Sequence, residues 1–554
     1  MIKRLIFIFI IYIPIFSFSQ EITKKWFFES IHFENDSTKK NLKKINNGDY
    51  ISINKDGSFE YELTALDLHA KGTWSLSNNI LSLQYTAPND TIRNYIINKN
   101  EKHLTLNENG INYVFKSHIK NNDFSLTTLA RGILAIICLL GIAFLFSKNR
   151  KGIKWDLVFK GLFIQILFAF AILKVPFIQN GFEWMSAVFV TILGFTREGS
   201  LFLFGDLISN TNSFGYIFAF QVLPTILFFS ALTSVLFYFG ILQKIVYAFA
   251  LFMKKTLKLS GSESLAAAGN IFLGQTESPL LIKPYIDKMS LSELLCLMSG
   301  GMATIAGGVL AAYIGFLGGN DPEAQLFFAK HLLAASVMSA PAAVVAAKIL
   351  LPEEDEVNED MSINDEQIGS NVLEAISIGT TQGLRLAINV GAMLLVFIAF
   401  ITMVNYFLED FLGNYTGINN WVSSLTDGQY EGFTLQFILG YALAPLTWLM
   451  GVCKQDIVLV GQLLGEKTIL NEFVAYVSLG ELKEGGKFFE KKSIIIATYI
   501  LCGFANFSSI GIQIGGIGAL APNRTKDLSK LGIPALIAGT LASLFTAVIV
   551  GLIL

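Results

Sequence analysis

Two short polar strings interrupt apolar segments and carry the groups best suited to binding a polar ligand. The first is Gln275-Thr276-Glu277, and the second is Asn471-Glu472. Each string combines a carboxylate with neighbouring amide or hydroxyl groups, so each offers both hydrogen-bond donors and acceptors. An ionisable residue inside a membrane-length apolar region is costly, which makes it by default a candidate for substrate or ion binding.

The first string lies in a segment that has the pattern of a re-entrant hairpin. Residues Asn270–Leu281 include glycine, proline and a carboxylate in a run too short to cross a bilayer twice. Irregular backbone is tolerated at membrane depth only where protein or a wet cavity covers it. The alternative is that Glu277 merely extends to a membrane interface.

The second string lies in a similar segment, Gly465–Tyr476, which follows the apolar stretch Ile457–Leu464. A second hairpin explains why Asn471 and Glu472 stand beside aromatic and small residues. The alternative is an exposed polar loop, an interpretation that suits Glu466 and its lysine neighbour better than the asparagine and glutamate.

Two further segments have the pattern of membrane spans that break partway. Residues Ser299–Val309 and Leu501–Gly511 are apolar but rich in glycine. Close helix packing alone could account for pairs such as Gly307-Gly308. Close packing accounts less well for the polar residues Asn506 and Ser508-Ser509. An unwound turn explains them better, since it would expose carbonyls and amides to a ligand.

The order of these segments indicates two repeats. A hairpin, a broken span and a plain span occur as Asn270–Ile286, Ser299–Tyr313 and Leu326–Leu350, and again as Ile457–Tyr476, Thr498–Gly518 and Ile533–Leu554. Paired discontinuous segments in two halves of a chain point to the midplane site of a secondary transporter. The sequence has no Walker A motif, which argues against a primary pump.

Apolar runs of about 20 residues, the length that crosses a bilayer, position these segments. The spans expected are Leu126–Phe146, Leu157–Phe177, Tyr216–Gly240, Leu294–Leu317, Leu326–Leu350, Ile388–Val404, Ile494–Ile517 and Ile533–Leu554, with Phe182–Thr196 as an interfacial helix. The first span precedes four basic residues, so its far end is cytoplasmic by the positive-inside rule. Lys483, Lys487, Lys491 and Lys492 conflict with this topology, because it places them outside.

The N-terminal part is expected to be secreted. Met1–Arg4 is basic, and the apolar stretch Leu5–Phe16 is followed by small polar residues, which is typical of a signal peptide. Residues 20–122 alternate apolar and polar positions between Asp-Gly and Asn-Gly turns, as around Asp56-Gly57. This pattern predicts an antiparallel sheet or small barrel, and the string Gly72–Leu76 resembles small lipocalin-like domains.

Composition excludes several other classes. Of the 554 residues 53% are hydrophobic and only 15% are charged, against about 25% charged in a soluble domain. The net charge of −2 argues against binding to nucleic acid. The four cysteines, in apolar segments, show no disulfide or metal-ligand spacing, and four of the five histidines precede the first span. No nucleophile and base accompany Glu277 and Glu472, so we do not expect an enzyme.

At these residues the chain resembles the concentrative nucleoside transporter family. The string Gly465-x-Lys467-x-x-x-Asn471-Glu472-Phe473-Val474-Ala475-Tyr476 matches the signature of the family. The strings Gly274–Glu277 and Gly503–Ser509 match as well, and the resemblance covers about Leu126–Leu554. It implies a homotrimer that imports nucleosides with sodium, or in some members protons, through a mobile transport part and a scaffold part.

The resemblance also implies a role for each motif residue. Gln275, Thr276 and Glu277 would face the nucleobase, with Val309 and Phe504 packing near it. The ribose hydroxyls would be held by Glu472, Asn506 and Ser509. The sodium ion would be bound by the Asn270 and Thr304 side chains and by the Leu273 and Ile305 carbonyls.

Together these inferences predict an α-helical polytopic membrane protein with two re-entrant hairpins, inverted repeats and about eight transmembrane helices, preceded by a small all-β extracytoplasmic domain. Its parts would be a signal peptide (1–19), a lipocalin-like domain (20–122), N-terminal scaffold helices (123–260), a first transport repeat (261–352), an acidic cytoplasmic linker (353–370) and a C-terminal membrane region (371–554).

The expected location is a bacterial inner membrane, with the β domain in the periplasm and the lipid bilayer around the helices. Two other functions stay open. The chain could carry free nucleobases or another small polar solute, or the β domain could make it a ligand sensor.

Overall fold

The computed structural model describes residues 25–33, 50–53, 57–63, 68–77, 80–87, 91–99, 103–108, 110–117, 126–209, 217–319, 321–355, 358–361, 369–426, 428–485 and 487–554. The expected signal peptide lies outside the described residues. The chain divides into two compact units. One comprises Met1–Asn121 with Thr416–Gly432, and the other comprises Asn122–Tyr415 with Phe433–Leu554.

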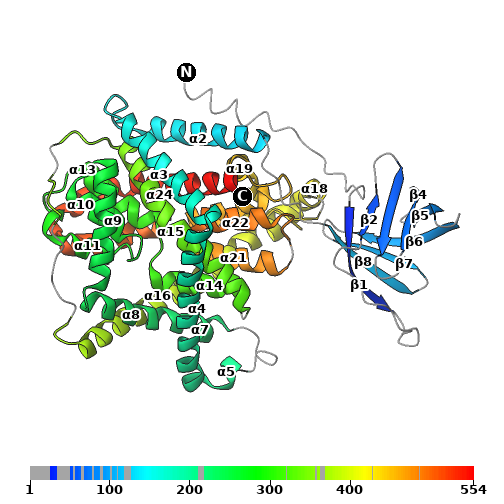
Figure 1. Cartoon of the computed structure of the whole chain (residues 1–554), viewed down its shortest axis with the longest axis horizontal. Coiled ribbons are helices and arrows are strands. Elements are labelled where there is room, and N and C mark those ends of the chain that lie inside the picture. Colours follow the sequence, from blue (N-terminus) through cyan, green and yellow to red (C-terminus); the bar gives the residue numbers. More distant parts are fainter. Residues whose placement is uncertain are drawn as a thin grey trace. The chain divides into compact units, whose positions relative to one another are not determined.

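The N-terminal unit is built on a closed antiparallel barrel of eight strands (Figure 1). Each strand pairs with the next, and the last pairs with the first. The strands are β1 (Lys25–Phe33), β2 (Tyr50–Ile53), β3 (Ser58–Leu63), β4 (Leu68–Ser77), β5 (Ile80–Ala87), β6 (Thr91–Lys99), β7 (His103–Glu108) and β8 (Ile111–Ser117). Closure removes the exposed sheet edges that would otherwise recruit other strands.

The alternation of apolar and polar residues fills this barrel. Inward positions along each strand supply a buried core, formed by Trp26, Phe28, Ile51, Ile53, Phe59, Leu81, Leu83, Tyr95, Ile97, Leu104, Leu106 and Phe115. The rings of Phe28 and Phe115 meet edge-on across the β1–β8 seam, with their centroids 4.6 Å apart. The predicted all-β domain is therefore confirmed.

The second unit is helical. Its first part contains α2 (Leu126–Phe146), α3 (Trp155–Lys174), α4 (Pro176–Phe204), α5 (Asp206–Ser209), α7 (Phe218–Gln221), α8 (Leu223–Tyr238) and α9 (Ile241–Leu257). The next part contains α10 (Gly261–Gly269), α11 (Ser278–Leu281), α12 (Lys283–Ile286), α13 (Leu291–Ala303), α14 (Gly307–Gly318) and α15 (Pro322–Leu350).

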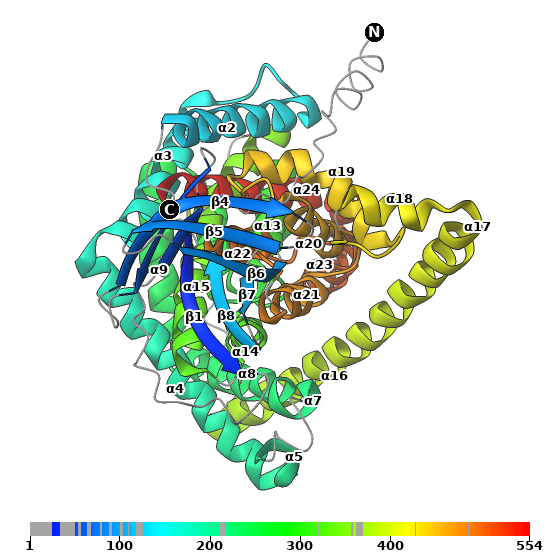
Figure 2. The ribbon, with the colours of Figure 1, turned by 90° about the vertical axis from the view of Figure 1, so that its right-hand side faces the viewer.

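A long connection and a second helical set complete this unit. The elements are α16 (Val372–Asn405), the π-helical turn η3 (Tyr406–Gly413), α17 (Asn414–Thr416), α18 (Ile418–Leu425), α19 (Leu435–Leu449), α20 (Ile457–Ile469), α21 (Glu472–Glu484), α22 (Lys491–Leu501), α23 (Phe507–Leu520), η4 (Pro522–Arg524) and α24 (Thr525–Ile553). Helix α18 is the exception, because it is grouped with the barrel unit. Figure 2 shows α16 as one long helix on one side of the helical unit.

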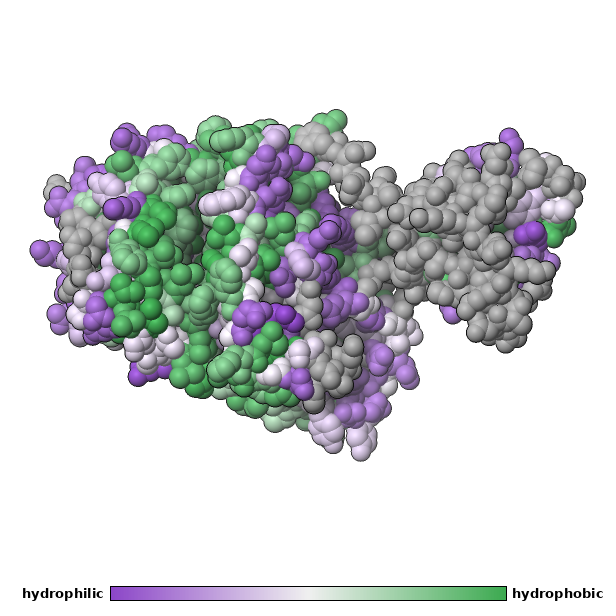
Figure 3. All heavy atoms as spheres, turned by 60° about the horizontal axis from the view of Figure 1, so that its bottom comes forward, coloured by the Kyte–Doolittle hydropathy of each residue, from purple (hydrophilic) through white to green (hydrophobic). Residues whose placement is uncertain are grey.

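Among the described residues, eight helices are long and apolar enough to cross a membrane. They are Leu126–Phe146, Trp155–Lys174, Pro176–Phe204, Phe218–Tyr238, Leu291–Gly318, Pro322–Leu350, Val372–Thr416 and Pro522–Ile553. On the face shown in Figure 3, apolar side chains form broad areas of this unit, as expected where lipid is the solvent. The expected multi-pass helical fold with about eight spans is confirmed.

The set differs from the expected spans at two points. The segment predicted to be a short interfacial helix is the 29-residue α4. The expected span Ile494–Ile517 is divided between α22 and α23, which have 11 and 14 residues.

The two predicted repeats have the same element order. In each, a helix–break–helix segment precedes a broken helix and a final helix of 29 residues, α15 or α24. The two final helices contact each other, and α24 also contacts α13 of the first repeat. Residues from both repeats can therefore meet at one place, although they are far apart in the sequence.

Polar residues define the ends of the half-helices. Asn471 caps α21 by accepting a hydrogen bond from the Val474 amide (2.9 Å), and Asn506 caps α23 by accepting one from the Ser509 amide (2.9 Å). Asparagine is a preferred N-cap residue because its side-chain oxygen satisfies an amide that has no partner within the helix. Two residues of the motifs thus determine where the breaks occur.

A buried ionic cluster joins the ends of the first repeat. The Lys348 ammonium, at the end of α15, pairs with the Glu263 carboxylate in the first turn of α10. It also contacts the Glu353 carboxylate (3.1 Å) and the Ser292 hydroxyl (2.9 Å). Ser290, which caps α13, donates to Glu353 (2.9 Å). The start of the acidic linker is therefore fixed to the hairpin that it follows in sequence.

Two of the lysines that conflict with the predicted topology have local partners. Lys483 donates to the Leu317 carbonyl and lies over the Phe328 ring, 5.2 Å from its centroid. Lys491 lies over the Phe327 ring at 4.4 Å. These contacts give both charges a structural role, so they are weak indicators of which side of the membrane they occupy.

The cluster predicts a pH-dependent contribution of Glu353 to stability. Burial raises the pKa of this carboxyl, but Lys348 and the Ser290 hydroxyl outweigh that effect and hold the pKa below 4.5. Its stabilising effect is therefore present above about pH 4.5 and is lost as the pH falls through the lower folded pKa. We expect Glu353→Gln to lower the thermal midpoint of the purified protein at pH 7, and the difference from wild type to shrink at acidic pH.

The matched control is Asp355→Asn, since Asp355 is exposed and only two residues away. It should leave the midpoint unchanged at every pH. A Glu353→Gln difference that stays constant from pH 7 down to about pH 3.5 would contradict the ionic role.

Candidate functional site

The tip of the first hairpin is a tight turn closed by its own carboxylate. The Gly274 amide donates to the Glu277 carboxylate at 2.6 Å. A Cβ atom at position 274 would lie 2.9 Å from the same oxygen, so a larger residue here would displace the carboxylate. Glu277 is consequently held with its carboxylate at the hairpin tip.

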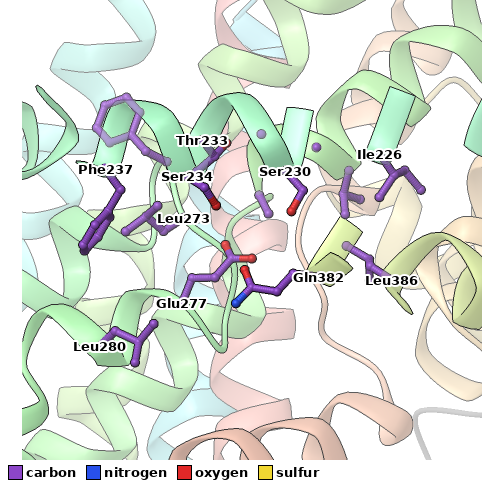
Figure 4. Close-up of a pocket in the computed structure, with 15 residues that line it drawn as sticks. Ile226, Ser230, Thr233, Ser234, Phe237, Leu273, Glu277, Leu280, Gln382 and Leu386 are labelled. Carbon is purple, nitrogen blue, oxygen red and sulfur yellow. The ribbon is translucent and has the colours of Figure 1, made fainter. Parts of the chain in front are cut away.

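This carboxylate lines a small cavity (Figure 4). Ser230 and Ser234 of α8 and Gln382 of α16 lie around it, and the Gln382 side chain points toward Glu277. The cavity measures about 50 Å³, which is space for a few water molecules, since a cavity of about 10–15 Å³ on this measure holds one. A larger ligand could contact Glu277 only if α8 and α16 moved away from the hairpin.

The two repeats meet at Gln275 and Ser509. The Gln275 amide nitrogen lies 3.3 Å from the Ser509 hydroxyl on α23. Both side chains are buried, yet the Gln275 amide oxygen has no partner among the described residues. Gln513, one helical turn beyond Ser509, donates to the Met298 carbonyl (2.9 Å) and leaves its own oxygen unpaired. Two buried acceptors are thus available at this junction.

Glu472 and Asn506 form a second polar pair. The Asn506 amide nitrogen donates to the Glu472 carboxylate at 2.5 Å. Both residues are almost fully buried, with 3% and 1% of their surface exposed. The Asn506 oxygen accepts from the Ser508 hydroxyl (2.7 Å) in addition to capping α23. The carboxylate is therefore presented beside the break of α22 and α23, with its orientation fixed by an amide that the helix end itself positions.

An aromatic group covers this pair. Tyr313 of α14 stacks on Tyr476 of α21 with centroids 4.1 Å apart and meets Phe473 edge-on at 5.2 Å. The Tyr313 hydroxyl interacts electrostatically with Glu472, although it makes no hydrogen bond of good geometry. It is fully buried and able to donate to a ligand bound there.

Oxygen atoms suited to a cation gather at the break between α13 and α14. Asn270 donates to the Leu297 carbonyl (3.3 Å), and its own side-chain oxygen is buried without a hydrogen-bond partner among the described residues. The Thr304 hydroxyl donates to the Gly300 carbonyl (2.9 Å), and the Asn270 amide group lies against Gly300. An unpaired, uncharged oxygen beside a helix C-terminus suits a hard monovalent cation such as sodium.

The other predicted residues lie in the same region. Leu273 shares the cavity with Glu277 and Val309, and Ile305 lies in the break that follows Thr304. Phe504 is buried in the second break, and Gly516 lies close to Thr276, where a Cβ would come within 2.6 Å of the threonine methyl. The predicted residues therefore lie on the two hairpins and the two breaks.

Sequence reasoning missed four residues of this region. Tyr313 and Gln513 lie in otherwise apolar stretches, where a lone polar side chain is a signal that could have been followed. Ser230 and Gln382 belong to helices that the motifs do not include. Their role depends on packing between distant segments, and no local pattern indicates it.

Family models match most of the helical part. A model described as "Na+ dependent nucleoside transporter C-terminus" matches residues 331–551, and its N-terminal counterpart matches residues 134–207. Between them, a model described as "Nucleoside recognition" matches residues 219–320.

Individual relatives agree with these matches. An uncharacterized transporter of Haemophilus influenzae is 40% identical over 424 residues, which cover 76% of this chain and 96% of that protein. The rat sodium/nucleoside cotransporter 1 is 38% identical over 438 residues, covering 76% and 63%. The solved structure of CNTnw in an inward-facing substrate-bound state matches with a TM-score of 0.69 at 36% identity, covering 77% and 99%. CNTnw in an outward-facing state matches with a TM-score of 0.68 at 36% identity, covering 77% and 98%.

The close approach of the two breaks yields a testable prediction. Gly503 has φ +91°, and a Cβ there would lie 2.5 Å from the carbonyl carbon of Ala303. Gly503→Ala should destabilise the protein by about 1–3 kcal/mol through backbone strain and overpacking. The measurement is the thermal midpoint of the purified full-length protein, which should fall by several degrees.

Gly511→Ala is the matched control, because a Cβ at this helical glycine meets nothing within 4 Å. It should keep or slightly raise the midpoint, as alanine favours helix more than glycine does. Equal midpoints for Gly503→Ala and the wild type would show that stability does not depend on the close contact between Gly503 and the Ala303 backbone.

Proposed function

The chain belongs to the family of sodium-dependent, or concentrative, nucleoside transporters, and from this premise we propose that it imports nucleosides by symport with a cation through elevator-type alternating access. The observation that carries the proposal is the convergence of polar groups from both repeats. Gln275 of the first repeat meets Ser509 of the second across 234 residues, and Glu472 meets Asn506 within the second repeat across 34 residues.

The Glu472–Asn506 pair suits a ribose. A ribose diol donates hydrogen bonds that a buried carboxylate can accept, and such charge-assisted bonds are about twice as strong as neutral ones. Asn506 and Ser509 offer further polar atoms at the start of α23. A site of this kind rejects analogues that lack the hydroxyls, because its own buried groups are then left unpaired.

Gln275, Thr276 and Glu277 suit the nucleobase. The unpaired Gln275 oxygen can accept from a ring nitrogen or amine, and the Glu277 carboxylate can do the same from the other side of the hairpin tip. Val309 and Phe504 are buried nearby and supply apolar surface for a planar ring. Purines and pyrimidines both present donors at their edges that these acceptors can bind.

Asn270 and Thr304, with the Leu273 and Ile305 carbonyls, would hold the coupling sodium ion. Bound there, the ion neutralises the partial negative charge at the end of α13. It would also draw the Asn270 oxygen toward the break and so order the hairpin that carries Gln275 to Glu277. A ligand shifts a conformational equilibrium only by its differential affinity for the two states, so ordering by sodium is what would couple ion and nucleoside.

The cavity beside Glu277 supports movement of one part against another. The cavity between the hairpin and helices α8 and α16 has a volume of about 50 Å³. A nucleoside can therefore enter it only if the hairpin-bearing part separates from these helices. We assign α8 and α16 to the stationary scaffold of a homotrimer in a bacterial inner membrane. The barrel would be a periplasmic, lipocalin-like accessory that follows a cleaved signal peptide.

The direct test is uptake of radiolabelled uridine and adenosine by proteoliposomes under an imposed sodium or proton gradient. We expect a sodium gradient to drive accumulation. Glu472→Gln should reduce uptake about 10- to 100-fold, because a hydrogen bond to a charged group contributes about 1.5–3 kcal/mol. The matched control is Glu481→Gln, an exposed glutamate on the same helix, which should transport normally.

Other outcomes would select other functions. Accumulation driven by protons alone, with equal nucleoside affinity in sodium and in choline at fixed pH, would remove sodium from the mechanism. Competition by free nucleobases, together with indifference to ribose modification, would make the protein a nucleobase carrier, for which Glu472 and Asn506 have no role.

Deleting residues 21–120 separates a transporter from a sensor. If the barrel is an accessory, the shortened protein should accumulate nucleosides at a rate close to wild type when equal amounts are reconstituted. A full loss of uptake, with a thermal midpoint equal to that of the intact protein, would show that ligand sensing by the barrel controls the membrane part.

A further inference from the structure

Lys467 is a fully buried cation in the first arm of the second hairpin, α20, with 0% of its surface exposed. Its ammonium group donates to the carbonyls of Ile500 (2.9 Å) and Cys502 (3.1 Å) and to the Ser543 hydroxyl (3.2 Å). All three of its hydrogens are therefore used, and none of the three partners carries a formal charge.

Those partners lie at a helix end that needs a cation. Helix α22 ends at Leu501, and Cys502 is its C-cap. The last carbonyls of a helix have no partner within it and carry the negative end of the helix dipole. In an apolar interior each unpaired carbonyl is costly. Lys467 satisfies two of them and places a positive charge at the C-terminal end of this half-helix.

The first repeat has a comparable helix end without a lysine, although its hairpin contacts α13 six residues before that end, at the Leu297 carbonyl. Helix α13 ends at Ala303, and Thr304 is its C-cap, as Cys502 is for α22. The first arm of the first hairpin reaches α13 through Asn270, a neutral residue whose oxygen has no hydrogen-bond partner among the described residues. The final helix of each repeat contributes a serine to the hairpin: Ser336 of α15 donates to the Ile271 carbonyl (2.9 Å), and Ser543 of α24 accepts from the Lys467 ammonium.

The second repeat also contains a carboxylate that a fixed cation can balance. Lys467 and Glu472 interact electrostatically across the hairpin break. Glu472 is buried and its hydrogen-bond partner, Asn506, is uncharged. A buried carboxylate without a nearby positive charge carries a desolvation cost of several kcal/mol. The ammonium of Lys467 therefore serves both the helix end and the carboxylate.

We propose that Lys467 is a resident cation that takes, in the second repeat, the place that the dissociable coupling ion takes in the first. This inference rests on the proposed cation symport. It makes the two hairpins unequal, because the first is ordered only when an ion binds and the second is ordered permanently by a tethered ammonium. It also predicts that these two breaks together use one dissociable cation per protomer.

Replacement of the tethered cation by a free one tests the proposal. Lys467→Ala removes the propylammonium part of the side chain and leaves space of that shape at the end of α22. We expect the thermal midpoint to fall and the affinity for uridine to drop by roughly tenfold or more, because the buried partners of the charge are left unpaired. Millimolar n-propylammonium should restore both, whereas tetramethylammonium, which has no N–H donors, and propan-1-ol, which has no charge, should not.

The controls separate this role from simple packing. The wild type and Lys487→Ala, an exposed lysine of the same repeat, should not respond to propylammonium. Equal rescue by propan-1-ol would show that the side chain only fills space, and no rescue by any amine would show that the site does not act as a cation site. Both results overturn the proposal.

A second variant covers the case in which Lys467→Ala does not fold. Lys467→Gln keeps two N–H donors but loses the charge, so we expect weaker uridine binding. Wild-type affinity in this variant would overturn the proposal. In the wild type, sodium should promote uridine binding with a Hill coefficient of about 1, the value for a single site, and a value near 2 would contradict the resident cation.

The thermal midpoint distinguishes failure of this inference from failure of the proposed function. Rescue of the midpoint by propylammonium needs no nucleoside, so it can be observed even if the wild type binds no uridine. Uridine binding by the wild type, in turn, can be observed even if the amines have no effect.

Discussion

The requirement that every backbone polar group find a partner at apolar depth controls the rest of this structure. Uninterrupted helices meet it by themselves. The broken helices cannot, and their ends at Thr304 and Cys502 leave carbonyls that some other group must satisfy. Asparagine side chains cap the half-helices that begin after Leu470 and Ala505, and the Lys467 ammonium satisfies the carbonyl end of α22. The capping asparagines and Lys467 are therefore consequences of the breaks.

The same constraint explains why the candidate site is where it is. A residue that caps a half-helix is held rigidly, and its remaining donors and acceptors point into the gap between the halves. Asn506 illustrates this, because its oxygen caps α23 while its nitrogen holds Glu472. Preorganisation of this kind reduces the ordering cost of binding. In the described strands of the barrel, by contrast, each strand pairs with its neighbours and the core is apolar.

The sequence predicts the breaks better than it predicts their partners. Glycine, proline and carboxylates in apolar runs locate both hairpins and both broken spans, because the cost of polar groups in lipid acts locally. The pairing of Gln275 with Ser509 and of Lys467 with Ser543 spans 234 and 76 residues, and no local pattern contains it. The sequence does not predict helix α19 or the full length of α4, for a related reason. Hydropathy indicates that a segment is excluded from water, but it does not show which segments it packs against.

The position of Glu277 adds a constraint on the proposed alternating access. In this conformation Gln382 and two serines of α8 surround the carboxylate at the hairpin tip. If the hairpin slides along α8 and α16, these polar neighbours are left behind, and the carboxylate must exchange them for water or for substrate. An unpaired carboxylate facing the apolar remainder of α8 would be too costly to populate. In the proposed cycle the bound nucleoside would replace these polar neighbours in the loaded state, and in the unloaded state the Gly274 amide, which moves with the hairpin, would remain the partner of the carboxylate.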